Sequence, residues 1–213
     1  MMRYPLVIGS AILLSLAGTV AGQQADKTQP VSIGIVLDTS GSMGANIALA
    51  RGLVSELANS AGSQDDFALI QASDRPVVLS GFVGAGDAQA HASFTQAKGR
   101  SALLDAIYLG SQLMRASRNA RKVLLVISDG VDNSSRYTAA EIRDSIREAG
   151  VRVYAIGVSR QPIAGGTTTE EALHSTLLPQ LAEQARGAYF SVERTSELPA
   201  LAQQLNAAVR TQP

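Results

Sequence analysis

The sequence of 213 residues contains no cysteine and only two histidines. The lack of cysteine excludes disulfides, iron–sulfur clusters, zinc ribbons and thiol nucleophiles, and two histidines are too few for a three-histidine catalytic zinc site. Neither sign of charge is in excess, because 18 Lys and Arg residues balance 18 Asp and Glu residues. This balance argues against nucleic acid as a partner. Hydrophobic residues make up 46% of the chain, which predicts one globular domain with a substantial core.

A long hydrophobic run is also missing. The apolar stretch at residues 6–16 is shorter than the roughly 20 residues that a membrane-spanning helix needs. Arg3 precedes this stretch and small residues follow it, which is the pattern of a secretory signal. We therefore expect residues 1–22 to be a signal peptide and residues 23–30 a short polar leader. The mature protein is expected to be periplasmic or secreted, with no membrane span; an uncleaved anchor is the alternative.

Strand and helix patterns alternate from Val31 to residue 210. Runs rich in β-branched residues predict strands at 31–37, 67–73, 75–79, 122–128, 151–158 and 188–192, and Pro76 places the third of these at a sheet edge. Apolar residues at spacings of three and four predict helices at 47–61, 103–114, 138–149, 179–185 and 198–208, whereas 81–99 is ambiguous and 161–169 is expected to be a mobile loop. This alternation predicts an α/β fold: a doubly wound, mostly parallel central sheet with helices on both faces.

Polar residues follow two of the buried strands and precede one helix. Asp38, Ser40 and Ser42 alternate directly after the first strand, Ser101 opens the helix at 103–114, and Asp129 follows the fourth strand. Because the carboxyl ends of parallel strands meet at one sheet edge, we expect these side chains to lie close together. They offer oxygen atoms only, which are the ligands that hard divalent cations such as Mg²⁺ and Ca²⁺ prefer.

The Asp-x-Ser-x-Ser pattern of Asp38, Ser40 and Ser42 resembles the metal-ion-dependent adhesion site of von Willebrand factor type A (VWA) domains. The segment 101–106 is similar to the threonine loop of that family and the segment 127–132 to its second aspartate loop; the resemblance covers about residues 31–210. It implies a Rossmann-like fold and a protein partner that supplies an acidic residue to the metal. It also implies a divalent cation, Mg²⁺ first and Mn²⁺ or Ca²⁺ as alternatives, held by Asp38, Ser40, Ser42, Ser101 and Asp129.

Two residues depart from the pattern of that family. Ser101 stands where threonine is usual, which keeps the hydroxyl but loses the methyl group that stiffens the side chain. Arg100 stands where glycine is common, and a cation so close to a metal ligand should weaken metal binding unless it points outward or pairs with an acid. Serine also has ordinary roles in turns and at helix N-termini, and Ser101 is placed to cap the helix at 103–114.

The sequence is compatible with three functions. The first is a binding module, not an enzyme, in which a partner carboxylate completes the coordination of the cation. The second is a metal-dependent hydrolase or phosphoryl-transfer enzyme with Asp38 as nucleophile, which lacks a nearby lysine; an aspartic protease is disfavoured because that fold is all-β. The third is a structural domain with a degenerate metal site. Asp105 is expected to stabilise its helix and Asp132 to contact the metal ligands rather than the ion.

Overall fold

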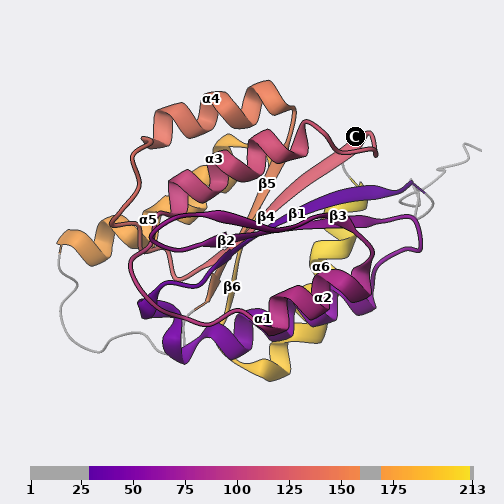
Figure 1. Ribbon diagram of the computed structural model, residues 1–213, viewed down its shortest axis with the longest axis horizontal. Helices are drawn as coiled ribbons and strands as arrows, with labels where there is room; N and C mark the ends of the chain where they lie inside the picture. The colour runs from indigo at the N-terminus through magenta and orange to yellow at the C-terminus, as the bar shows by residue number, and fades with distance from the viewer. Residues whose placement is uncertain (1–28, 159–168, 212–213) are drawn as a thin grey trace, which may run out of the picture.

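The computed structural model describes residues 29–158 and 169–211 (Figure 1). The expected signal peptide and most of the expected 161–169 loop lie outside these ranges, so those two expectations stay predictions. The strands are β1 (Val31–Asp38), β2 (Asp66–Ala72), β3 (Val77–Val83), β4 (Arg121–Ser128), β5 (Arg152–Val158) and β6 (Tyr189–Val192). They form one sheet in the order β3-β2-β1-β4-β5-β6, in which only the β2–β3 pair is antiparallel.

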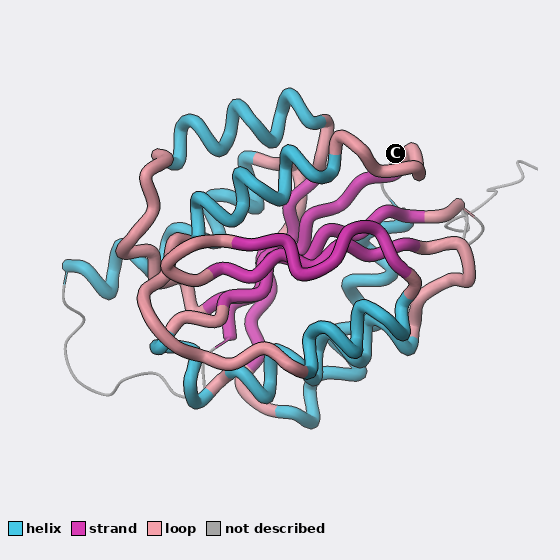
Figure 2. The backbone as a smooth tube through the Cα atoms, in the orientation of Figure 1, coloured by secondary structure: helices cyan, strands magenta, loops and turns pink. Residues whose placement is uncertain are grey.

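Helices cover both faces of this sheet (Figures 1 and 2). One face is covered by α1 (Ile47–Asn59), α2 (Ala85–Ser93) and α6 (Leu198–Thr211), and the other by α3 (Leu103–Met114), α4 (Ala139–Ala149) and α5 (Thr169–Gln184). Each face has its own hydrophobic cluster, and the sheet lies between the two. The expected doubly wound, mostly parallel α/β fold is therefore confirmed. None of the described helices is long and apolar enough to cross a membrane.

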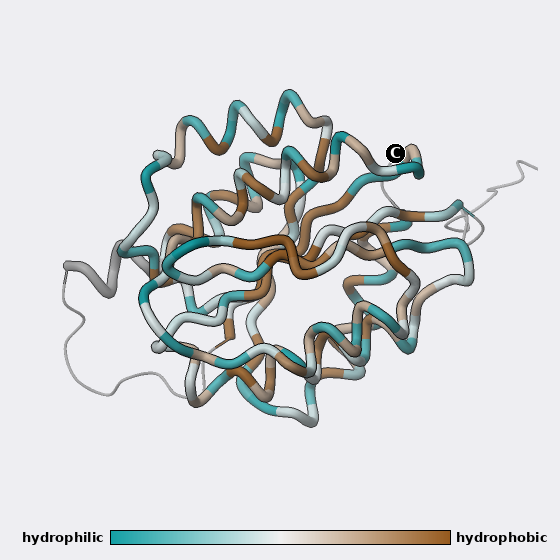
Figure 3. The backbone as a smooth tube through the Cα atoms, in the orientation of Figure 1, coloured by the Kyte–Doolittle hydropathy of each residue, from teal (hydrophilic) through white to brown (hydrophobic). Residues whose placement is uncertain are grey.

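Burial on both faces explains the sequence of the central strands. All eight residues of β1 are buried, and the hydropathy drawn in Figure 3 is highest along the strands. A strand that contacts helices on both sides has no solvent face, so its sequence is a continuous apolar run without alternation. Helix α4 instead has one buried stripe, and a capping box begins it: Thr138 and Glu141 bind each other's backbone N–H. Gly150 ends α4 at φ 64°, where glycine is favoured.

Two elements differ from the expectations. Helix α5 begins at Thr169, ten residues before the expected start at Pro179, so this proline lies inside the helix. The buried residues Leu178, Leu181 and Ala182 flank Pro179 on both sides, and their packing offsets the cost of about 3 kcal/mol for an interior proline. Strand β3 lies at the sheet edge as expected, but it begins only after Pro76, which has no N–H to donate.

Candidate metal centre

The three polar loops meet at the carboxyl edge of the sheet. Across the parallel β1–β4 pair, Leu37 is aligned with Ile127, so the chain leaves both strands at the same level. The loop after β1 is joined to the segment before α3 by a hydrogen bond from the Gly41 N–H to the Gly99 carbonyl (2.9 Å). The sheet therefore brings together residues that are up to 91 positions apart, from Asp38 to Asp129.

Asp38 is the buried centre of this group. Its side chain has no solvent exposure, and its Oδ1 accepts the Ser40 N–H (2.9 Å). Its Oδ2 accepts the hydroxyls of Ser128 (2.6 Å) and Ser101 (3.4 Å). Burial raises the pKa of the Asp38 carboxyl, the hydrogen bonds from Ser128 and Ser40 oppose that rise, and the nearby charge of Asp129 adds to it. In the part of the chain that the structure describes, no lysine or arginine forms an ion pair with Asp38.

Ser40 and Ser42 lie on the same side of the loop after β1. Their hydroxyl oxygens are 3.0 Å apart, as the alternating positions predict. Ser40 is buried at 2% exposure, whereas Ser42, in the short helix η1 (Gly41–Ala45), is exposed. The group is therefore closed on the side of Asp38 and open to solvent on the side of Ser42.

Ser101 is fully buried and does not cap α3, so the expectation of a capping role is wrong. The N-terminal residue that flanks α3 is Ala102, and the Leu103 N–H is bound instead by the Asp132 carboxylate (3.1 Å). Ser101 is held by Asn133, which accepts its N–H and donates to its carbonyl, both at 3.0 Å. These contacts leave the Ser101 hydroxyl to donate to Asp38.

Asp129 follows β4 and is half-buried. Its Oδ1 accepts the Val131 N–H (3.2 Å) across a turn in which Gly130 has a φ of 87°, a conformation that favours glycine. The two other aspartates nearby accept hydrogen bonds from backbone N–H groups. Asp132 binds Leu103 N–H, as above, and Asp105 accepts the N–H groups of Arg136 (2.8 Å) and Tyr137 (3.1 Å). Asp105 thus stabilises the contact between α3 and the loop after β4.

Arg100 is exposed and turned along the surface. Its guanidinium donates to the Asn133 carbonyl, and its backbone N–H donates to the Asp74 carboxylate (2.6 Å). Gly99, at φ 75°, allows the chain to turn there. Because Arg100 is exposed, solvent screens its charge from the buried proposed ligands Asp38 and Ser101.

Sequence reasoning missed Ser128. This last residue of β4 donates to Asp38 and accepts the Gly130 N–H (2.9 Å), so it links the first carboxylate to the turn that carries Asp129. A signal was available: in the parallel register, Ser128 follows Ile127 as Asp38 follows Leu37. A hydroxyl residue at that position can reach the carboxylate across the two strands.

The donor atoms fit a hard divalent cation. The described residues hold no cluster of three or more His, Cys, Asp or Glu side chains suited to a metal, which excludes a soft or carboxylate-rich site there. Two carboxylates and three hydroxyls instead match an ion that keeps several waters. The buried carboxylate of Asp38 supports the same conclusion, because a buried charge without an ionic partner is costly and a cation would offset that cost.

Comparisons with known proteins agree with this fold. Three solved structures are similar: a von Willebrand factor type A protein from Catenulispora acidiphila (15% identity, TM-score 0.68), an aerotolerance-related membrane protein from Bacteroides fragilis (19%, 0.69) and proximal thread matrix protein 1 from the mussel byssus (19%, 0.64). In the same order, the matches cover 85%, 85% and 86% of this chain. They cover 43%, 100% and 46% of the chains of the similar structures. No curated protein sequence matches. The model of the von Willebrand factor type A domain matches residues 32–204, and the chain therefore belongs to that family.

Proposed function

We propose that this protein is an exported VWA domain that binds one divalent cation and uses it to bind another protein. The proposed ligands are Asp38, Ser40, Ser42, Ser101 and Asp129. The observation that carries the proposal is the environment of Asp38, a fully buried carboxylate whose described partners are hydroxyl and amide groups. The proposal includes the signal peptide at 1–22, a domain at 31–210 and a periplasmic or secreted location.

The proposed ligands would contribute differently to binding the ion, according to their position. Asp38 and Asp129 would balance the charge of the ion, with Ser128 holding Asp38 in place through its 2.6 Å hydrogen bond. Ser40 and Ser101 would contribute neutral oxygens from the buried side, and Ser42 from the exposed side. When bound, the ion would supply a positive charge that a carboxylate of a partner protein can approach from solvent.

The similar structures support this proposal. The mussel byssus protein, at 19% identity to this chain, has a structure in which zinc occupies its metal-ion-dependent adhesion site (MIDAS) motif. Another similar structure is the vWF domain of a type V pili tip protein from Porphyromonas gingivalis (13% identity, TM-score 0.63). For this chain Mg²⁺ is the first candidate, with Mn²⁺ and Ca²⁺ as alternatives, because all five proposed ligands offer oxygen.

A binding role is preferred to catalysis. An aspartate nucleophile needs access to its substrate, but Asp38 has no solvent exposure. Both of its carboxylate oxygens already accept hydrogen bonds from serine groups: the Ser40 N–H at Oδ1, and the Ser101 and Ser128 hydroxyls at Oδ2. The exposed side of the site, at Ser42, instead suits the docking of a partner.

Thermal unfolding with and without metal tests the cation site. Saturation at about 100 times the Kd stabilises the folded state by about 2.7 kcal/mol, which raises Tm by about 5–10 °C in a domain of this size. Wild-type protein should show this rise with Mg²⁺ or Mn²⁺, and the Asp38→Ala/Asp129→Ala variant should not. The matched control is Asp87→Ala/Asp144→Ala, which removes two exposed carboxylates elsewhere and should keep the rise. An equal rise in the site variant would refute the site.

Partner binding needs a separate experiment, because a cation could be structural. Proteins captured from an envelope extract with Mg²⁺ should be released by chelator. The Ser42→Ala variant, which changes only an exposed ligand, should capture less of the same partner. Capture that is unchanged both by chelator and by Ser42→Ala would show that recognition uses another face.

A further inference from the structure

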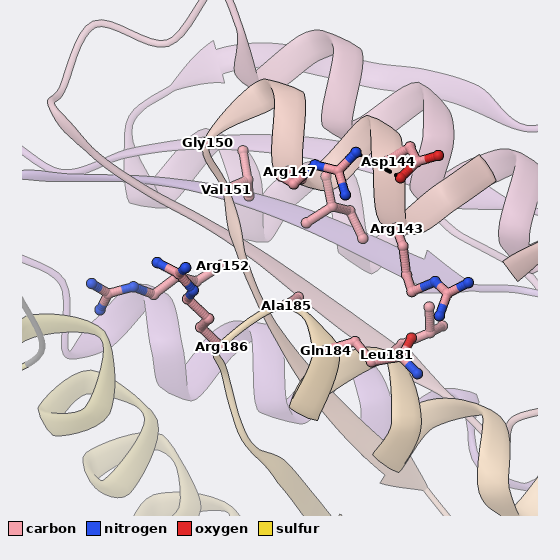
Figure 4. Close-up of a pocket in the computed structure, with 11 residues that line it drawn as sticks. Arg143, Asp144, Arg147, Gly150, Val151, Arg152, Leu181, Gln184, Ala185 and Arg186 are labelled. Carbon is pink, nitrogen blue, oxygen red and sulfur yellow. Dashed lines mark ion pairs between the residues drawn. The ribbon is translucent and has the colours of Figure 1, made fainter. Parts of the chain in front are cut away.

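A cavity lies at the amino-terminal edge of the sheet, opposite the candidate metal centre (Figure 4). It has a volume of about 700 Å³ and lies between the C-terminal ends of α4 and α5, beside the start of β5. Its charged lining consists of Arg143, Asp144, Arg147, Arg152 and Arg186. Its apolar lining consists of the buried side chains Ile146, Val151, Leu181 and Ala185. The cavity thus combines arginine side chains with an apolar floor, and it contains none of the proposed metal ligands.

The charge of this cavity is unlike that of the whole chain. Four arginines face one aspartate in the lining, whereas the full sequence is neutral. Figure 4 shows Arg152 and Arg186 at one end of the cavity and the α4 residues at the other. Asp144 pairs with Arg147 at 2.8 Å, but these side chains are 60% and 76% exposed, so that pair is weak. Arginines therefore outnumber acids in the lining, and its composition favours an anion as the ligand.

Helix dipoles account for only part of this arginine cluster. Arg147 lies in the last turn of α4, where a cation interacts favourably with the helix C-terminus. Arg143 lies in the middle of α4 and Arg152 begins a strand, so the dipole does not explain them. Among the described residues, Arg186 alone has a positive φ (56°) without being glycine, a conformation that is unfavourable for an arginine. Arg186 lies just after α5, where its N–H donates to the Glu183 carbonyl, so this conformation ends the helix and the helix C-terminus accounts for its charge as it does for Arg147.

We propose that this cavity binds a small, soluble organic phosphate. Arginine recognises phosphate through paired, charge-assisted hydrogen bonds, and several arginines match the charge of a phosphate monoester. The apolar floor matches a hydrocarbon or aromatic body attached to the phosphate. The volume of about 700 Å³ lies within the usual range of cavities for small ligands, about 300–1,000 Å³. The site is independent of the metal at the other edge.

Calorimetric titration of the purified protein with phenyl phosphate tests the proposal, with chelator present so that no divalent cation can hold the probe. Phenyl phosphate should bind more tightly than inorganic phosphate, which lacks the apolar body. The Arg152→Gln/Arg186→Asn variant should bind phenyl phosphate at least about 30-fold more weakly, since it loses the two guanidinium groups that lie at the same end of the cavity. Asparagine is chosen at position 186 because it tolerates positive φ.

Two further variants separate binding from folding. Arg75→Gln removes an exposed arginine from the turn between β2 and β3 and should leave the affinity unchanged. Asp144→Asn removes the one acid of the lining and should tighten binding about threefold, a gain that a folding defect cannot produce. The proposal is overturned if phenyl phosphate does not bind, if the double variant binds like wild type, or if Asp144→Asn weakens binding. Binding to phosphatidylglycerol vesicles without binding to phenyl phosphate would also overturn it.

Discussion

A buried ion pair attaches α6 to the rest of the domain, and its loss should be costly. Arg210 (8% exposed) pairs with Asp65 (6% exposed), and the Asp65 carboxylate also accepts the N–H groups of Val31 (2.9 Å) and Gly62 (2.7 Å). Removing one partner of a buried pair costs about 3–5 kcal/mol, because the other charge stays buried without a counter-ion. The two remaining N–H donors to Asp65 place the cost of Arg210→Met near the lower end, at about 3 kcal/mol. The Tm of the Arg210→Met variant should therefore fall by about 6–12 °C.

Urea unfolding followed by circular dichroism measures this cost. The matched control is Arg115→Met, which breaks an ion pair with Glu148 (2.9 Å) whose side chains are 46% and 64% exposed. That variant should lose less than about 1 kcal/mol. Adding Asp65→Asn to Arg210→Met should cost less than the sum of the two single changes, because the buried charge is gone. A loss of under about 1 kcal/mol for Arg210→Met, equal to the control, would refute the reasoning.

Three shorter predictions concern other parts of the domain. Ser128→Ala should lower the free energy of unfolding without metal by about 1–3 kcal/mol, because Asp38 loses its 2.6 Å donor; an unchanged urea midpoint would contradict this. Burial acts to raise the pKa of Asp105, but hydrogen bonds from Tyr137 and Arg136 hold it below its ordinary value. Asp105→Asn should therefore be less stable than wild type above about pH 5, and urea midpoints should converge as the pH falls below about 4. Gly187→Ala would place a Cβ atom in steric overlap with the Val153 carbonyl oxygen and should abolish soluble expression. Gly86→Ala, with open space around it, should stabilise α2 by about 0.5–1 kcal/mol.

The sequence by itself determined the fold class and the order of most elements; α2 lies in the stretch 81–99, which the sequence left ambiguous. Buried strands such as β1 and β4 are continuous apolar runs, and a helix such as α4 has an apolar stripe between a capping box and a glycine. These signals are local, since each depends on residues within one element and on the solvent it faces. The positions of Asp38 and Asp129 after parallel strands were also enough to predict a shared edge.

Only the tertiary structure decided which side chains touch at each edge. It showed that Ser128 binds Asp38, that Ser101 is directed at Asp38 and does not cap α3, and that α5 continues through Pro179. It also brought the arginines of α4 and β5 to one cavity together with Arg186. Each of these features depends on contacts between segments far apart in the chain, and their energies outweigh the local preferences of serine, proline and arginine. Local patterns specify elements, whereas packing between the elements specifies the sites.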